Sequence, residues 1–129
     1  MDLDDRIAIT DLISMHGHLV DAGEPPDRLF TPDVRYDVSD LGGGVIVGTA
    51  ALWEAGLALG DGNPVGHHVT NVVLTDVGPD EVEGLSKAIG IMADGSCASL
   101  TYKDVVVRTP AGWRISHRQV IPRRRPLGR

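Results

Sequence analysis

The chain has 129 residues, of which 42% are hydrophobic and 23% charged, which suits one folded domain with a single core and excludes general disorder. Eighteen acidic residues against twelve basic ones give a net charge of -6, which argues against a nucleic-acid-binding protein. Cys97 is the only cysteine, so an internal disulfide and a cysteine-based zinc cluster are excluded.

The first residues are acidic where a secretory signal would be basic, and no apolar run is long enough to cross a bilayer. Together with the lone cysteine, this predicts a cytoplasmic protein without a membrane-bound segment.

The first half of the chain predicts two helices and a hairpin. Hydrophobic residues recur at steps of three and four over residues 4–21, which indicates a one-faced helix that Gly23 and two prolines end. Alternation over residues 34–38 and an apolar run at 45–47, with three glycines between them, predict a hairpin. Residues 50–59 fit a second helix that Gly60 closes.

The second half of the chain is rich in β-forming residues. Four such runs follow one another, separated by segments of turn composition and hairpin length: 67–75, 81–92, 97–108 and 113–121. Helices first and an antiparallel meander last predict an α+β fold. We therefore expect one domain over residues 1–121 and a solvated basic tail over 122–129, which holds four of the twelve basic residues.

A sheet of this length can bend over the helices like a cone. Alternate side chains from each strand then line the concave face, and such a hollow usually holds a small molecule. Aromatic residues make up only 4% of the chain, so we expect a largely aliphatic lining.

Several segments resemble, in order and spacing, the nuclear-transport-factor-two-like superfamily, and within it the SnoaL-like polyketide cyclase and scytalone dehydratase branch. They are the helix opening at 7–13, an aspartate at the helix end, Leu29-Phe30-Thr31-Pro32-Asp33, residues 66–71, Tyr102-Lys103-Asp104 and residues 112–115. The resemblance implies a cone-shaped, curved antiparallel or mixed sheet wrapped around the N-terminal helices, an α+β barrel.

Asp21 and His68 are the expected catalytic residues. A carboxylate at a helix C-terminus is destabilised and becomes a better proton acceptor, and in the resembling dehydratases an aspartate at the matching place pairs with a histidine. Neighbouring strand residues face opposite sides, so only one of His67 and His68 can face the hollow. The resemblance favours His68, the histidine next to Val69. His67 is the second choice, and we expect its side chain to hydrogen-bond a backbone carbonyl instead.

Four further residues are expected to bind substrate. His16 lies on the apolar flank of the first helix where relatives often carry a tyrosine, although a buried structural histidine fits equally well. Tyr36 and Tyr102 can polarise a carbonyl through their phenols, and Trp53 can line the mouth of the pocket. Cys97 is expected to be a small buried hydrophobe. No residue spacing demands a metal, and no motif predicts a nucleotide, so we expect no metal and no cofactor.

These residues support two hypotheses from different classes. The first is a cofactor-independent acid–base enzyme, a cyclase, dehydratase or isomerase, acting on a small hydrophobic oxygenated molecule such as a polyketide ring. The alternative is a non-catalytic ligand-binding or assembly module, or an accessory subunit like the small subunit of ring-hydroxylating dioxygenases. Val105 and Val107 alternate with Val106, so the strand is apolar on both faces and a homodimer through the sheet is expected.

Overall fold

The computed structural model describes all 129 residues, and its two α-helices match the sequence prediction. Helix α1 spans Leu3–Asp21 and helix α2 spans Thr49–Leu59. Four short 3-10 turns connect or follow the larger elements: η1 (Pro26–Arg28), η2 (Ser39–Leu41), η3 (Gly60–Gly62) and η4 (Pro126–Gly128).

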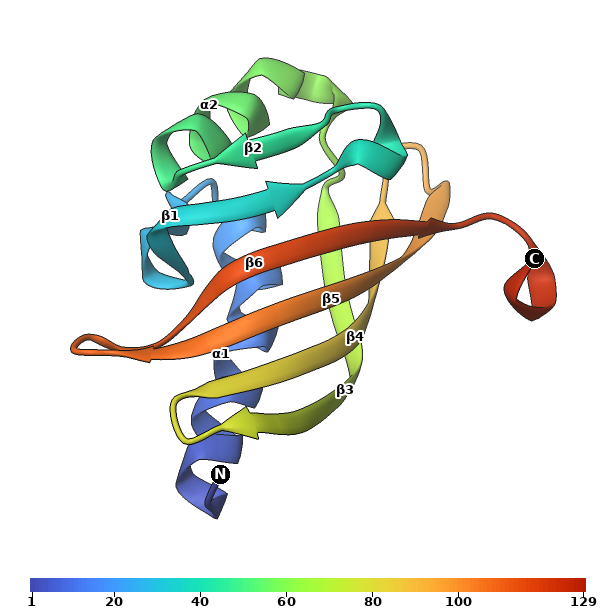
Figure 1. The fold of residues 1–129 in the computed structure, drawn as a ribbon. Coiled ribbons are helices and arrows are strands. Elements are labelled where there is room, and N and C mark those ends of the chain that lie inside the picture. Colours follow the sequence, from blue (N-terminus) through green and yellow to red (C-terminus); the bar gives the residue numbers. More distant parts are fainter.

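Six strands form one sheet in the order β2-β1-β6-β5-β4-β3 (Figure 1). Their bounds are β1 (Phe30–Asp37), β2 (Val45–Val47), β3 (Gly66–Gly78), β4 (Glu81–Ile91), β5 (Cys97–Thr109) and β6 (Gly112–Arg123). The predicted β1–β2 hairpin and the meander from β3 to β6 are both confirmed. Strand β6 continues to Arg123, so part of the expected tail belongs to the sheet.

One pairing does not follow from hairpin patterns. Strand β1 pairs in parallel with β6, with Phe30 opposite Ile115 and Tyr36 opposite Arg118, which makes the sheet mixed. The outermost strands, β2 and β3, do not pair with each other, so the sheet stays open and does not close into a barrel. The α+β class and the curved mixed sheet are confirmed.

Helix α1 begins with a reciprocal cap. Asp2 accepts a hydrogen bond from the backbone N–H of Asp5, and the side chain of Asp5 accepts one from the N–H of Asp2. Asp5 also accepts hydrogen bonds from the indole Nε1 of Trp113 (3.1 Å) and from Arg108 (3.2 Å). These bonds hold the pKa of Asp5 below its usual value and tie the start of α1 to the β5–β6 hairpin.

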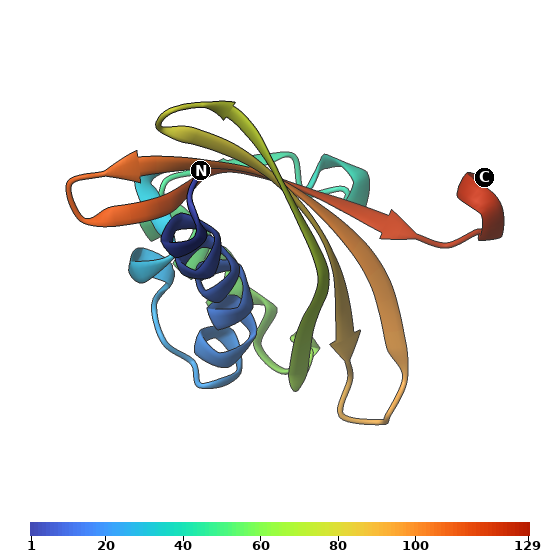
Figure 2. The ribbon, with the colours of Figure 1, turned by 90° about the horizontal axis from the view of Figure 1, so that it is seen from below.

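The sheet bends around α1, which lies in its concave face (Figure 2). β-Bulges contribute to this bend. Strand β3 has one between Thr70 and Val73, where Asn71 has a φ of 57°, and another between Asp76 and Gly78. Strand β6 has one in which Ser116 is the extra residue opposite β5. A bulge adds twist and reverses the side-chain alternation beyond it, so each of these strands changes the set of residues that face inward.

The buried core has two parts. The larger lies between α1 and the sheet, and its members are Ile9, Ile13, Leu19, Leu29, Phe30, Val34, Leu74, Val82, Val106, Trp113 and Ile115. The smaller comprises Ala88, Tyr102 and Val120 at the other end of the sheet. Cys97 is exposed at the start of β5, so its expected burial is wrong. No helix is long and apolar enough to span a membrane.

Candidate functional site

The structure pairs Asp21 with His67. Asp21 is the last residue of α1, and His67 is the second residue of β3. Ring atom Nδ1 of His67 lies 2.7 Å from Oδ1 of Asp21, and the backbone N–H of His67 donates to both carboxylate oxygens at 3.1 Å. The two side chains are partly sheltered, with 17% of His67 and 33% of Asp21 exposed.

The prediction that Asp21 pairs with His68 is therefore wrong, because the histidine that pairs with Asp21 is His67. His67 lies opposite Gly90 and Val69 opposite Ala88 on the inward side of the sheet, while His68 lies opposite the exposed Ile89 and is itself exposed. Since Val69 packs against the core, the residue two positions earlier must face the same way. His68 thus points to the outer face of the sheet, away from Asp21 and His67.

The geometry of the pair fixes which ring nitrogen is free. An ionised carboxylate only accepts hydrogen bonds, so Nδ1 of His67 must carry the proton that it shares with Asp21. The neutral imidazole then has its lone pair on Nε2. A carboxylate that orients a histidine in this way is the usual arrangement of a general base.

His16 lies next to this pair and is buried in α1. Its ring meets those of His67, Tyr102 and Phe30 edge to face, with centroids 6.0, 5.8 and 6.4 Å away. Burial, and then the positive charge of Arg118, lower the pKa of His16 well below its ordinary value. His16 is thus a neutral imidazole, and its Nδ1 has no hydrogen-bond partner within the protein.

A buried ion pair that the sequence analysis missed lies beyond His16. Arg118 of β6 donates from Nε and Nη2 to the two carboxylate oxygens of Asp104 in β5, at 2.7 and 2.8 Å, and both side chains are fully buried. Burial opposes the charge of Arg118, but Asp104 outweighs that effect and raises the pKa of the guanidinium. The remaining nitrogen, Nη1, has no partner within the protein.

The two tyrosines lie around this guanidinium. The guanidinium carbon of Arg118 is 4.1 Å from the ring centroid of Tyr102 and 5.7 Å from that of Phe30, and Phe30 meets Tyr36 edge to face at 5.8 Å. Burial raises the pKa of both phenols, so each keeps its O–H at neutral pH. Asp21, His16, Tyr36 and Tyr102 thus belong to one neighbourhood, with His67 in place of His68.

Trp53 does not join this neighbourhood. It lies half-buried in α2 and makes none of the ring contacts that link His16, Phe30, Tyr36 and Tyr102. No group of three histidine, cysteine, aspartate or glutamate side chains is close enough to hold a metal ion.

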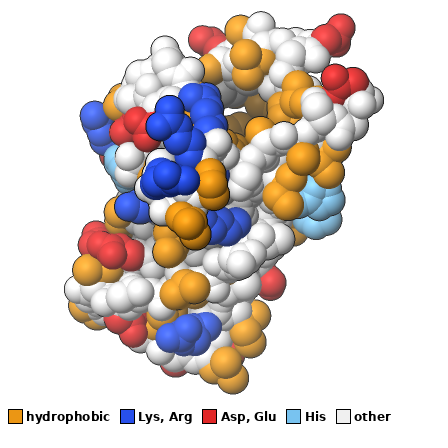
Figure 3. Space-filling view, turned by 90° about the vertical axis from the view of Figure 1, so that its right-hand side faces the viewer, with side chains coloured by type: hydrophobic (Ala, Val, Ile, Leu, Met, Phe, Trp, Pro, Cys, Tyr) orange, Lys and Arg blue, Asp and Glu red, His pale blue; other side chains and the backbone are white.

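A second, smaller apolar region lies around Tyr102. Partly buried Val38, Val69 and Leu100 pack against the small cluster of Ala88, Tyr102 and Val120. Figure 3 looks onto the side of the molecule on which the C-terminus lies in Figure 1, and it shows a hollow with hydrophobic side chains on its walls and Lys or Arg side chains along one rim.

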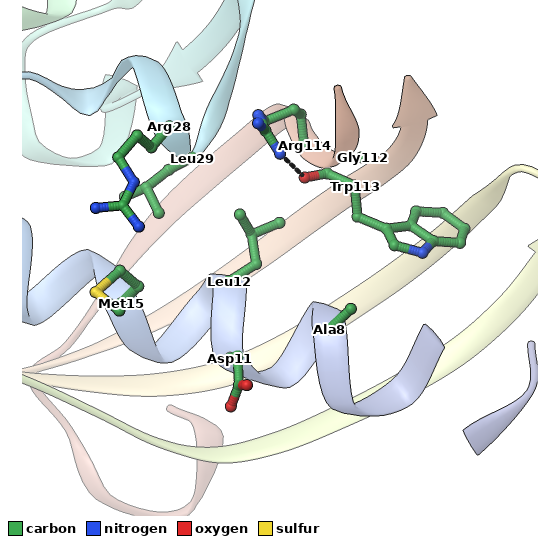
Figure 4. A pocket seen from close by; sticks show the side chains of 9 residues that line it. All are labelled: Ala8, Asp11, Leu12, Met15, Arg28, Leu29, Gly112, Trp113 and Arg114. Carbon is green, nitrogen blue, oxygen red and sulfur yellow. Dashed lines mark hydrogen bonds between the residues drawn. The ribbon is translucent and has the colours of Figure 1, made fainter. Parts of the chain in front are cut away.

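Two other pockets lie away from Asp21 and His67. One, of about 340 Å³, lies on the outer side of α1 between Leu12, Met15 and the start of β6 at Trp113 (Figure 4). The second, of about 410 Å³, lies on the outer face of the sheet around Val73 and Leu85. Neither includes a residue that the sequence analysis proposed for the site.

Comparison with known proteins agrees with this architecture. A family model described as a SnoaL-like domain matches residues 1–119. The chain belongs to the SnoaL-like family. The fold is the one also called nuclear-transport-factor-two-like or cystatin-like, as the sequence resemblance implied.

Solved structures match over nearly the whole of this SnoaL-like chain. A nuclear-transport-factor-two-like protein with a cystatin-like fold from Novosphingobium aromaticivorans is 28% identical, with 92% of this chain and 81% of that chain covered and a TM-score of 0.75. A candidate scytalone dehydratase from the same organism is 19% identical, with coverages of 98% and 95% and a TM-score of 0.77. Hexachlorocyclohexane dehydrochlorinase LinA-type3 from Novosphingobium barchaimii is 21% identical, with coverages of 95% and 88% and a TM-score of 0.79.

The last two similarities establish the fold alone, because their sequence identity is low. A search of curated protein sequences found no match.

Proposed function

We propose that the protein is a cofactor-independent acid–base enzyme that moves a proton on a small hydrophobic, oxygenated molecule. The observation that carries this proposal is the Asp21–His67 pair, in which a carboxylate orients an imidazole at the edge of a mostly apolar interior. The dehydratase and dehydrochlorinase among its structural neighbours support a lyase, and the same groups also suit a cyclase or an isomerase.

The proton acceptor in this proposal is Nε2 of His67. Asp21 holds the proton on Nδ1 and stabilises the imidazolium that forms when Nε2 takes a proton from substrate carbon. The backbone hydrogen bonds from His67 to the same carboxylate keep the two residues in register during this step. Such assistance accelerates proton transfer by about a hundred- to ten-thousand-fold.

The negative charge that develops on the substrate needs stabilising donors. Nη1 of Arg118 is buried and unpartnered, and the phenols of Tyr36 and Tyr102 lie near the same guanidinium. Neutral phenols donate hydrogen bonds to an enolate oxygen, and a guanidinium adds positive charge. His16 is neutral and therefore offers a polar contact without a charge.

The chemical balance is simple for an elimination. The C–H electron pair left behind by proton transfer to His67 forms the new double bond, and the bond to the leaving group breaks with its electrons. A departing hydroxide takes up the proton from the imidazolium and leaves as water. In an isomerisation the same proton returns to a different carbon, so no oxidant or reductant is required.

A hydrophobic substrate fits the approach to this site. Val38, Val69 and Leu100 pack against the cluster that contains Tyr102. The surface hollow in Figure 3 also has hydrophobic walls. Burying a small carbocycle there removes apolar surface from water. A polyketide-like ring with a carbonyl or hydroxyl group meets both requirements.

A specific observation favours a second candidate, a binding module without catalysis. The two pockets described above lie outside the Asp21–His67 neighbourhood, and the side chains of His16, Tyr102 and Arg118 occupy the space between α1 and the sheet. A plugged interior would leave the pair with a structural role in joining α1 to β3.

We also propose that two copies pair through the outer face of the sheet. Val73 and Leu85 are 57% and 44% exposed there, and Glu83 and Lys103 line the same shallow pocket. An apolar centre with both signs of charge around it is suited to a two-fold interface, in which each copy presents the same surface.

Solvent isotope exchange tests the catalytic proposal directly. Candidate cyclic ketones and hydroxyketones are incubated with the protein in D2O, and deuterium uptake and product mass are followed by mass spectrometry. The proposal expects exchange or elimination that is lost in Asp21→Asn and His67→Gln. Ligand-induced thermal stabilisation with no exchange for any stabilising ligand would support the binding module instead.

A further inference from the structure

Helix α1 and strand β3 approach each other closely at Gly17 and His67. A Cβ atom placed on Gly17 would overlap the carbonyl oxygen of His67 and lie 3.3 Å from its carbonyl carbon. Real Cβ atoms essentially never come nearer than 3.0 Å to such an atom, so a side chain at position 17 would force the helix and the strand apart.

The same turn of α1 contacts His67 on its other side. Gly17 and Asp21 are four residues apart and therefore lie one above the other on the helix. Asp21 accepts hydrogen bonds from the backbone N–H and the ring Nδ1 of His67, while Gly17 lies against the carbonyl group of His67. One helical turn thus holds both peptide groups of His67.

The usual reasons for a glycine do not apply at this position. Gly17 is the only glycine in α1, its φ is not positive, and it is four residues from the helix end. Glycine is also a poor helix former, so local structure alone disfavours it. The close approach of His67 is the feature that requires the missing side chain.

We propose that Gly17 is a positioning residue that sets the distance between α1 and β3, and thereby holds the imidazole of His67 against Asp21. This inference rests on the proposed function of that pair. A side chain here would displace His67 by on the order of 1 Å, and a misplacement of this size can cost about a hundredfold in rate.

The test compares Gly17→Ala with Gly56→Ala. Both residues lie within helices, and a Cβ on Gly56 in α2 meets nothing within 4 Å, so the control adds the same methyl group in open space. Gly66→Ala is a second control beside the pair, since its Cβ would make only ordinary contacts with His68 and Ile91. Side-chain ¹⁵N NMR of His67 reports its tautomer and its hydrogen bond to Asp21 without any substrate.

The inference expects Gly17→Ala to shift the His67 ring signals and to weaken the Nδ1 hydrogen bond, while both controls keep the native spectrum. Once a substrate is known, kcat should fall by about a hundredfold with KM nearly unchanged. If Gly17→Ala does not fold in buffer, the spectra of all variants are recorded in sucrose, which favours the folded state. His67 signals in Gly17→Ala that match those of Gly56→Ala would overturn the inference.

The outcome separates this inference from the proposed function. A shifted His67 in Gly17→Ala, together with full turnover in Asp21→Asn, would keep the positioning role and refute the proton chemistry. An unshifted His67 in Gly17→Ala refutes the positioning role, whatever the turnover of the Asp21 variant.

Discussion

The carboxylate of Asp21 binds His67 twice, through the backbone N–H and through ring Nδ1, although the two residues are 46 positions apart. This contact joins the end of α1 to the start of β3 and leaves Nε2 as the free nitrogen of the imidazole. In the proposed function, this one contact both links α1 to β3 and prepares the proton acceptor.

Removing one partner of the buried ion pair should be severely destabilising. In Asp104→Ala, the guanidinium of Arg118 would stay fully buried without its carboxylate, which typically costs about 3–5 kcal/mol of unfolding free energy. Urea denaturation followed by circular dichroism measures this loss.

An exposed ion pair provides the matched control. Asp80→Ala removes a carboxylate from Arg108 on the surface, where solvent screens the interaction, and should leave the urea midpoint almost unchanged. A double variant, Asp104→Leu with Arg118→Met, should recover much of the lost stability while removing the charge from the site. Equal losses of stability in Asp104→Ala and Asp80→Ala would contradict the claim that burial makes the loss of the carboxylate costly.

His16 should make the folded state sensitive to mild acid. Its pKa is lowered by burial and then by the positive charge of Arg118, so the unfolded chain takes up a proton that the folded chain resists. Below the ordinary value of 6.5, stability should therefore fall as the pH falls, by up to about 1.4 kcal/mol per pH unit. At higher pH this contribution is fully present.

Urea midpoints measured between pH 7.5 and about pH 5 check this prediction. His16→Gln should flatten the pH dependence relative to the native protein, whereas His18→Gln, which alters an exposed residue of the same helix, should not. Identical slopes in the native protein and His16→Gln would show that His16 does not contribute.

Asn71 should tolerate glycine but not a β-branched residue. Its φ of 57° lies in the left-handed region, which asparagine and glycine adopt far more readily than valine. We expect Asn71→Gly to unfold near the native midpoint and Asn71→Val to lose about 1–2 kcal/mol. Equal midpoints for the two variants in thermal denaturation would contradict the strained bulge.

The proposed homodimer predicts that a charged side chain placed on the outer face of the sheet lowers the mass of the protein in solution from dimer to monomer. Leu85→Glu should shift the protein from dimer to monomer at micromolar concentration in analytical ultracentrifugation, because it buries a charge without a partner. Leu57→Glu on α2 changes a leucine that is more exposed than Leu85, 60% against 44%, and lies outside that face, so this control should remain dimeric. A native protein that sediments as a monomer would remove the proposal.

The elements of this fold could be predicted from the sequence because they follow local rules. Hydrophobic spacing gave helices 4–21 and 50–59, which the structure places at Leu3–Asp21 and Thr49–Leu59, and turn composition separated the four long strands. The parallel pairing of β1 with β6 has no local signal, since it joins segments from opposite ends of the chain.

Bulges and face assignments explain most of what was missed at the site. Counting alternate residues from Trp113 and Ile115 places Arg118 on the outer face, and only the extra residue at Ser116 turns it inward. His67 is a different case, because its shared face with Val69 could have identified it, and the resemblance pointed to its neighbour. Tyr102 and Asp104 are two positions apart in one strand and therefore share a face. This spacing is the one sign in the sequence that a charged side chain lies in the interior.

The central claim is that His67, and not His68, is the proton acceptor. The most direct measurement compares the single-turnover rates of His67→Gln and His68→Gln on a substrate found by deuterium exchange. The account predicts a loss of about a hundred- to ten-thousand-fold in His67→Gln and a native rate in His68→Gln. A native rate in His67→Gln, or an equal loss in both variants, would contradict it.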